Sequence, residues 1–92
     1  MSFKVVFTKS YDKLERAFLK KHPDLWGRYH KTLKSLESNP FHPGLRLHAL
    51  HDQYKGYYSV SINMRYRMTV DLLIQGREII LMNIGDHNEV YR

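Results

Sequence analysis

The spacing of hydrophobic residues changes along the chain, and each spacing predicts a different kind of element. Residues 3–8 are mostly aromatic or β-branched, which predicts a short strand. Ser10 is suited to cap a helix that runs to about residue 21. The apolar positions of this helix fall on one face: Tyr11, Leu14, Ala17 and Phe18.

A second helix is predicted to start with Pro23 in its first turn and to end at Asn39-Pro40. Its apolar stripe also has helical spacing: Leu25, Tyr29, Leu33 and Leu36. Trp26 lies beside the stripe, and we expect it to be an anchor in the core or between the helices. Because the two helices follow each other closely, they are expected to pack antiparallel.

The remainder of the chain changes to a period of two. Residues 41–56 hold two Gly and three His and are predicted to be mostly loop, with a strand-like alternation over residues 45–49. Residues 57–62 and 65–72 alternate apolar and polar side chains on either side of a turn at Asn63-Met64. Gln75-Gly76 marks the next turn. Residues 79–84 are apolar on both parities, which is typical of a central strand buried on both sides.

The predicted order of elements is therefore βααβββ, a small α+β domain that spans residues 1–92. Short turns predict an antiparallel sheet, and two consecutive helices can cover only one of its faces. The other face is expected to be open, concave, polar and cationic, which suits a phosphate group. The side chains expected there are Ser59, Ser61, Arg65, Arg67 and Thr69.

Composition and charge narrow the possible functions. A chain of 92 residues builds one core, which excludes a large two-domain enzyme. It has no Cys, so it has neither a disulfide framework nor a thiolate nucleophile, and a reducing cytoplasm is the easier fit. We expect neither a signal peptide nor a membrane span. The formal net charge of +6 predicts a polyanionic or acidic partner.

Arg65 and Arg67 are the first candidates for a binding role. Two positions apart on one strand, they would share a face, where two guanidinium groups could grip one phosphodiester or two adjacent ones. The alternative is an exposed strand whose arginines pair with Asp71 or Glu78. The spacing alone does not decide between them.

His87 is the candidate for proton transfer. It follows Gly85-Asp86 just after the last predicted strand, and a histidine can donate or accept a proton at neutral pH. A single histidine near a chain terminus is more often a surface residue. The combination with Arg67 and Tyr91, which could converge on the same face, favours a functional role.

Metal and cofactor chemistry find little support. His48 and His51 could bind a metal together only on a helix, and no Cys or carboxylate completes a ligand set, so no metal site is predicted. The chain lacks a phosphate-binding Gly-rich loop, a nucleophile elbow and a dinucleotide fingerprint. We expect no small-molecule cofactor and exclude ATP hydrolysis, serine acyl transfer and hydride transfer.

Several segments together resemble the RelE/ParE superfamily of bacterial toxins from toxin–antitoxin pairs, over essentially the whole chain. After the strand and helical hairpin come His48-Ala49-Leu50 ahead of Lys55-Gly56, then Arg65-Tyr66-Arg67, then Ile-Gly-Asp-His-Asn-Glu-Val-Tyr at residues 84–91. The resemblance implies a cognate antitoxin as partner. RelE-like members are similar to mRNA endonucleases that bind the ribosomal A site, whereas ParE-like members are similar to poisons of DNA gyrase.

The resemblance implies individual roles in the RNA-cleaving branch. Arg67 matches the arginine that contacts the scissile phosphate, His87 the residue near the leaving group, and Tyr91 the terminal aromatic residue near the substrate. His48 matches a histidine of YafQ-like members. A second histidine and an aspartate of those members are replaced here by Ser61 and Arg65, so these two roles do not carry over and the base stays unassigned.

RNA cleavage also fits the residues chemically. The 2′-hydroxyl of RNA is a built-in nucleophile, so an enzyme must only orient it, stabilise the charge on the phosphorus oxygens and move two protons, without a metal. Arg67 and Arg65 would stabilise the phosphate and His87 would protonate the 5′-oxygen, while His48 or Lys55 would assist the 2′-hydroxyl. The expected RNA-binding side chains are Arg65, Lys55 and Arg46.

Two other functions remain open at this point. A gyrase inhibitor would use its basic helices to bind a protein, and a domain of the same shape could bind nucleic acid without cutting it. The joint presence of Arg67, His87 and Tyr91 favours the nuclease, because a protein that only binds gyrase needs no proton donor. The predicted substrate is mRNA, with the ribosome as a further partner.

Overall fold

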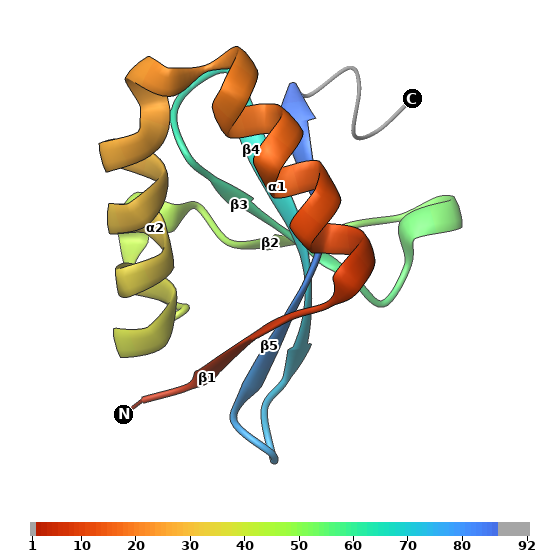
Figure 1. The fold of residues 1–92 in the computed structure, drawn as a ribbon. Helices are drawn as coiled ribbons and strands as arrows, with labels where there is room; N and C mark the ends of the chain where they lie inside the picture. Colours follow the sequence, from red (N-terminus) through yellow and green to blue (C-terminus); the bar gives the residue numbers. More distant parts are fainter. Residues whose placement is uncertain (1, 87–92) are drawn as a thin grey trace.

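A computed structural model describes residues 2–86, in which two helices form a layer against one face of a sheet (Figure 1). No helix in this part of the chain is long and apolar enough to cross a membrane. Within residues 2–86 there are also three single-turn 3₁₀ helices: η1 (Pro23–Leu25), η2 (Pro43–Leu45) and η3 (Asp52–Tyr54). The main elements are β1 (Lys4–Phe7), α1 (Lys9–Lys21), α2 (Trp26–Ser38), β2 (His48–Ala49), β3 (Tyr58–Ser61), β4 (Tyr66–Leu73) and β5 (Glu78–Asp86).

Both predicted helices are present, with differences at their first turns. Thr8, rather than the predicted Ser10, caps α1: its extended backbone fits the cap position, and its hydroxyl accepts a hydrogen bond from the Tyr11 amide at 3.1 Å. Pro23 starts the 3₁₀ turn η1, and α2 follows it directly. The second helix ends before Asn39, as predicted.

The predicted α+β fold class is confirmed, with a mixed rather than purely antiparallel sheet. The strand order is β1-β5-β4-β3-β2. Strands β2 to β5 pair antiparallel, whereas β1 lies at the edge parallel to β5. β1 can pair parallel to β5 because the two strands are far apart in the sequence, and the segment between them includes the helical hairpin that covers one face of the sheet. The short strand β2 lies within the segment predicted to be mostly loop.

The loop between β3 and β4 is one residue longer than the predicted two-residue turn. The Ile62 amide donates to the Tyr66 carbonyl at 2.9 Å, so residues 63–65 form the loop. The Asn63 side chain accepts hydrogen bonds from the amides of Arg65 and Tyr66, at 2.9 and 2.8 Å. This side chain satisfies the loop backbone and places Arg65 outside β4.

A β-bulge in β5 accounts for part of the apolar pattern of residues 79–84. Val70 pairs with Leu81 but Thr69 pairs with Asn83, so Met82 is the extra residue in β5. Leu81 before the bulge and Ile84 after it both face the core, although their numbers differ in parity. The prediction of a central strand buried on both faces holds in part: β5 lies between β1 and β4 and Ile80 is half-buried, whereas Met82 is 38% exposed.

The core lies between the sheet and the helices and is closed by a hydrogen-bonded pair of tyrosines. The hydroxyl groups of Tyr11 on α1 and Tyr29 on α2 are 2.7 Å apart, and Tyr29 also donates to a Glu15 oxygen at 2.6 Å. Burial raises the pKa of both tyrosines above the ordinary value of 10.0, so both stay neutral in the folded protein. This chain of hydroxyl groups joins the two helices.

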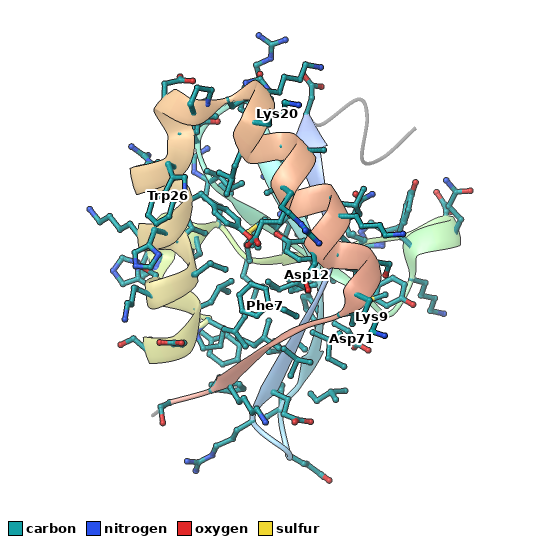
Figure 2. The ribbon with its side chains drawn as sticks, viewed as in Figure 1. Phe7, Lys9, Asp12, Lys20, Trp26 and Asp71 are labelled. Carbon is teal, nitrogen blue, oxygen red and sulfur yellow. The ribbon has the colours of Figure 1, made fainter. Side chains whose placement is uncertain are left out.

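Three predicted apolar positions lie outside the core. Of the four apolar positions predicted on one face of α1, Tyr11 and Phe18 are buried, whereas Leu14 and Ala17 are exposed. Trp26 is 56% exposed, which corrects its expected role as an anchor, and its ring stacks on that of His30 at 5.3 Å. Figure 2 shows Trp26 on α2, the first residue of that helix.

We predict that Tyr29→Phe lowers the free energy of unfolding near pH 7 by about 1–3 kcal/mol, because it leaves the buried Tyr11 hydroxyl and Glu15 with unmet hydrogen bonds. Since the folded pKa values are raised, stability should be intact below pH 10 and fall above it, as the unfolded chain loses tyrosine protons first. Urea denaturation near pH 7 and about pH 11 measures both effects.

The decrease in the free energy of unfolding between pH 7 and about pH 11 should be smaller in the Tyr29→Phe variant than in the parent. Tyr57→Phe, at a half-buried position, is the matched control and should behave as the parent. A Tyr29→Phe variant as stable as the parent near pH 7 would contradict the structural role of this chain of hydroxyl groups.

Candidate functional site

The sheet register gathers most of the predicted polar residues on the face opposite the core. His48, Ser59, Thr69 and Asn83 are successive cross-strand partners from β2 to β5, and partners in register share a face. Two residues away along each strand, the next row on the same face is Ser61, Arg67 and Gly85. We call these two rows the polar face.

Arg67 is the central side chain of the polar face. It is half-buried in β4, and its Nη1 donates a hydrogen bond to the Ser61 hydroxyl at 2.9 Å. Its Nε is buried and has no hydrogen-bond partner in the described part of the chain. No carboxylate within residues 2–86 pairs with this guanidinium, so its charge is available to an anion.

The prediction of a fully open face is wrong at three hydroxyl residues. Ser59, Ser61 and Thr69 are all buried. Arg67 lies against Ser61 through their hydrogen bond, which accounts for part of this burial. Ser59 Oγ and Thr69 Oγ1 are buried and have no hydrogen-bond partner in the described residues, which is uncommon for buried hydroxyl groups.

Arg65 does not share a face with Arg67, so the predicted pair of adjacent guanidinium groups is wrong. Arg65 belongs to the β3–β4 loop, and its Nε contacts an Asp86 oxygen at 3.0 Å. Its guanidinium also lies 5.4 Å from the centre of the Tyr66 ring, which packs against Phe18 of α1. The longer loop turns this side chain toward the helices.

The other predicted residues lie around the polar face at different distances from its centre. His48 lies on the face itself, exposed, with Nδ1 3.1 Å from the Arg46 carbonyl oxygen. Arg46 precedes β2 and lines a groove that includes Ser61. Lys55 is exposed in the loop between β2 and β3 and lines a separate pocket there.

His87 and Tyr91 lie outside the described residues, so their predicted positions near Arg67 stay predictions. The described strand β5 ends at Asp86, which is opposite Tyr66 and adjacent to Gly85 of the polar face. Within residues 2–86 no group of three His, Asp or Glu side chains gathers in a form that could hold a metal ion.

Two contacts at this site were not predicted from the sequence. Ser61 is the cross-strand neighbour and hydrogen-bond partner of Arg67. A three-residue loop at residues 63–65 would have predicted this pairing, whereas the predicted two-residue turn does not. Arg28 on α2 donates from Nε to the Ile62 carbonyl at 2.9 Å, joining a helix to the end of β3. No local sequence signal predicts this second contact, because it depends on how α2 lies against the sheet.

Comparisons with known proteins identify the fold. No protein-family model and no curated protein matches the sequence. The solved structure of YafQ from E. coli strain BL21(DE3) matches with a TM-score of 0.80 and 15% identity, over 98% of this chain and 99% of that one. The toxin–antitoxin complex DinJ–YafQ from E. coli matches with a TM-score of 0.78 and 16% identity, over 100% of both chains.

A third match places the fold more widely among toxins. The YoeB–YefM complex from Staphylococcus aureus matches with a TM-score of 0.70 and 18% identity, over 95% of this chain and 99% of that one. The chain therefore has the fold of the YafQ and YoeB toxins, which agrees with the fold that the resemblance implied. Among these structures, YafQ and its complex are similar over almost the entire length.

We predict opposite stability effects for two hydroxyl groups of the polar face. Ser61→Ala removes the acceptor of Arg67 and should cost about 0.5–1.5 kcal/mol. Thr69→Val replaces a buried, unpartnered hydroxyl by a methyl group and should be neutral or stabilising. Urea denaturation of both variants measures the difference, and a Thr69→Val variant less stable than Ser61→Ala would contradict the hydrogen-bond assignment.

Proposed function

We propose that the chain is the toxin of a toxin–antitoxin pair and that it cleaves mRNA on the ribosome, using the polar face as its active site. One observation carries the proposal: Arg67 is half-buried on a sheet, held by a neutral hydroxyl and without a carboxylate partner in the described residues. A guanidinium in such a place has its charge unused by the fold. A phosphodiester is a partner of matching charge and geometry.

The proposed reaction is transesterification within the RNA. The 2′-oxygen attacks the adjacent phosphorus and the bond from phosphorus to the 5′-oxygen breaks, which gives a 2′,3′-cyclic phosphate and a 5′-hydroxyl end. Arg67 stabilises the negative charge that grows on the phosphate oxygens. His87 donates a proton to the departing 5′-oxygen, and Tyr91 orients the substrate.

The proton of the attacking 2′-hydroxyl needs an acceptor, and His48 is the candidate on the polar face. It lies in the same row as Ser59 and Thr69, one row from Arg67. Its Nδ1 is 3.1 Å from the Arg46 carbonyl, and when the ring donates there its Nε2 is left as an acceptor. Lys55 and Arg65 are proposed to bind the RNA backbone further out.

An antitoxin is the proposed protein partner. The DinJ–YafQ and YoeB–YefM structures are complexes of a toxin with its antitoxin. A net charge of +6 and an unneutralised arginine favour an acidic antitoxin segment over the polar face. The chain is proposed to act in the cytoplasm, where mRNA and ribosomes are found.

Inhibition of DNA gyrase is the alternative function. One similar structure is described as a YoeB/ParE toxin from Agrobacterium tumefaciens. Gyrase poisoning is what the resemblance implies for ParE-like members. Such an inhibitor does not require Arg67 or His87 for chemistry. Variants at these two positions therefore distinguish the two functions.

We predict that Arg67→Ala slows mRNA cleavage by about 10²–10³-fold, because it removes one electrostatic stabiliser of the transition state. Arg67→Lys keeps the charge without the planar pair of donors and should recover only part of the rate. The measurement is cleavage of a ribosome-bound mRNA by purified protein. Arg16→Ala, which removes an exposed arginine from α1, is the matched control and should cut like the parent.

His87→Gln tests the proton donor, since glutamine keeps the polarity but cannot deliver a proton. We predict cleavage about 10²–10⁴-fold slower, with binding to mRNA and to the antitoxin unchanged. A substrate with a better 5′ leaving group should recover the rate. If the variant cuts as fast as the parent, His87 is not the general acid. This conclusion does not depend on the result for the Arg67 variants.

A further inference from the structure

A groove runs between α2 and the end of β3, and its lining carries four basic or titratable side chains. Arg28 and Lys31 come from α2, while His42 and Arg46 come from the segment that links α2 to β2. That segment packs against both α2 and β3, and in Figure 1 it is the yellow-green stretch beside α2. All four side chains are exposed, and no carboxylate is among the described lining residues.

Two of these donors are held in place by contacts within the fold. The Nε of Arg28 donates to the Ile62 carbonyl at 2.9 Å, which fixes the guanidinium at its base and leaves its terminal amino groups for a ligand. His42 Nδ1 accepts from the Gly44 amide at 3.1 Å, so a hydrogen of the ring lies on Nε2. A Cβ at position 44 would lie 3.2 Å from His42 Nδ1, and glycine allows this close approach.

Arg46 and Ser61 connect the groove with the polar face. Arg46 has a left-handed backbone with φ of 50°, an unfavourable conformation for a residue with a long side chain. It lines the part of the groove that reaches Ser61, whose hydroxyl accepts from Arg67. The groove therefore borders Ser61, the residue whose hydroxyl holds Arg67.

We propose that this groove binds the sugar–phosphate backbone of the RNA next to the scissile phosphate. The inference rests on the proposed function and extends it, because it adds Arg28, Lys31 and His42 to the RNA-binding surface. Donor groups without carboxylates suit phosphate oxygens. An antitoxin segment that folds on binding needs apolar anchor sites, whereas Leu45 and Ile62 in the lining are buried and only Met64 is exposed there.

The test is the affinity for a single-stranded RNA that carries 2′-O-methyl groups throughout and cannot be cut. The variant is Lys31→Gln with Arg46→Asn, since asparagine tolerates the left-handed backbone. We expect the Kd to rise about tenfold or more. The slope of log affinity against log salt should become shallower by about 1.4, the value for two lost phosphate contacts on a single strand.

The matched control is Lys34→Gln with Arg77→Asn. Lys34 is an exposed lysine of α2 that does not line the groove, and Arg77 has a φ of 53° in the β4–β5 turn. This variant loses the same charge and keeps the same backbone preference at its asparagine. It should change the Kd by less than about twofold.

Equal losses in the two double variants would mean that only net charge matters and would overturn the groove. If the Lys31→Gln, Arg46→Asn variant loses antitoxin binding but binds RNA like the parent, the groove binds the antitoxin and the proposal is wrong. If the parent cuts mRNA and the Lys31→Gln, Arg46→Asn variant binds RNA like the parent, the groove is refuted while the proposed function stands. A parent protein that neither cuts nor binds RNA would refute both.

Discussion

The alternation of side chains along β4 couples the core of this protein to its candidate site. Met68, Val70 and Leu72 pack into the core, so Arg67 and Thr69 must point to the opposite face. A slip of one residue would bury Arg67 under the helices and expose the apolar set. The position of Arg67 is therefore fixed by the same burial that stabilises the fold.

Pairing on both sides of β4 reinforces this constraint. Across β3, the register gives Arg67 a neutral hydroxyl from Ser61, and across β5 it gives Gly85, which has no side chain to oppose the guanidinium. The bulge at Met82 adds a residue without changing this arrangement, because Ile84 still faces the core and Gly85 the polar face. Arg67 is thus ordered by neutral neighbours, which leaves its charge for a ligand.

Periodicity was sufficient to predict both helices, the strands β1, β3, β4 and β5, and the side of the sheet on which Arg67 lies, but not the short strand β2. It failed where a contact depends on the exact number of residues in a loop. The Asn63 side chain completes a three-residue loop, and this loop moves Arg65 to the helix side, where it pairs with Asp86. Apolar character alone also failed for Trp26, because the start of α2 leaves its ring at the surface.

Features that depend on tertiary packing could not be read from the sequence. The parallel pairing of β1 with β5 follows from the path of the helical hairpin, and no turn encodes it. The groove beside Ser61 needs α2 to approach the end of β3, where Arg28 reaches the Ile62 carbonyl. The likeness to YafQ and YoeB shows the fold, and the residues of the polar face carry the proposal of RNA cleavage.

The chemical form of the RNA ends produced in bacterial cells is the most direct measurement of that proposal. After induction of the parent chain and of its Arg67→Ala variant, cellular RNA would be sequenced by ligation methods that distinguish 5′-hydroxyl from 5′-phosphate ends. The predicted result is new 5′-hydroxyl ends within mRNA, matched by 2′,3′-cyclic phosphates, for the parent only. Intact mRNA together with gyrase-linked DNA breaks would contradict it.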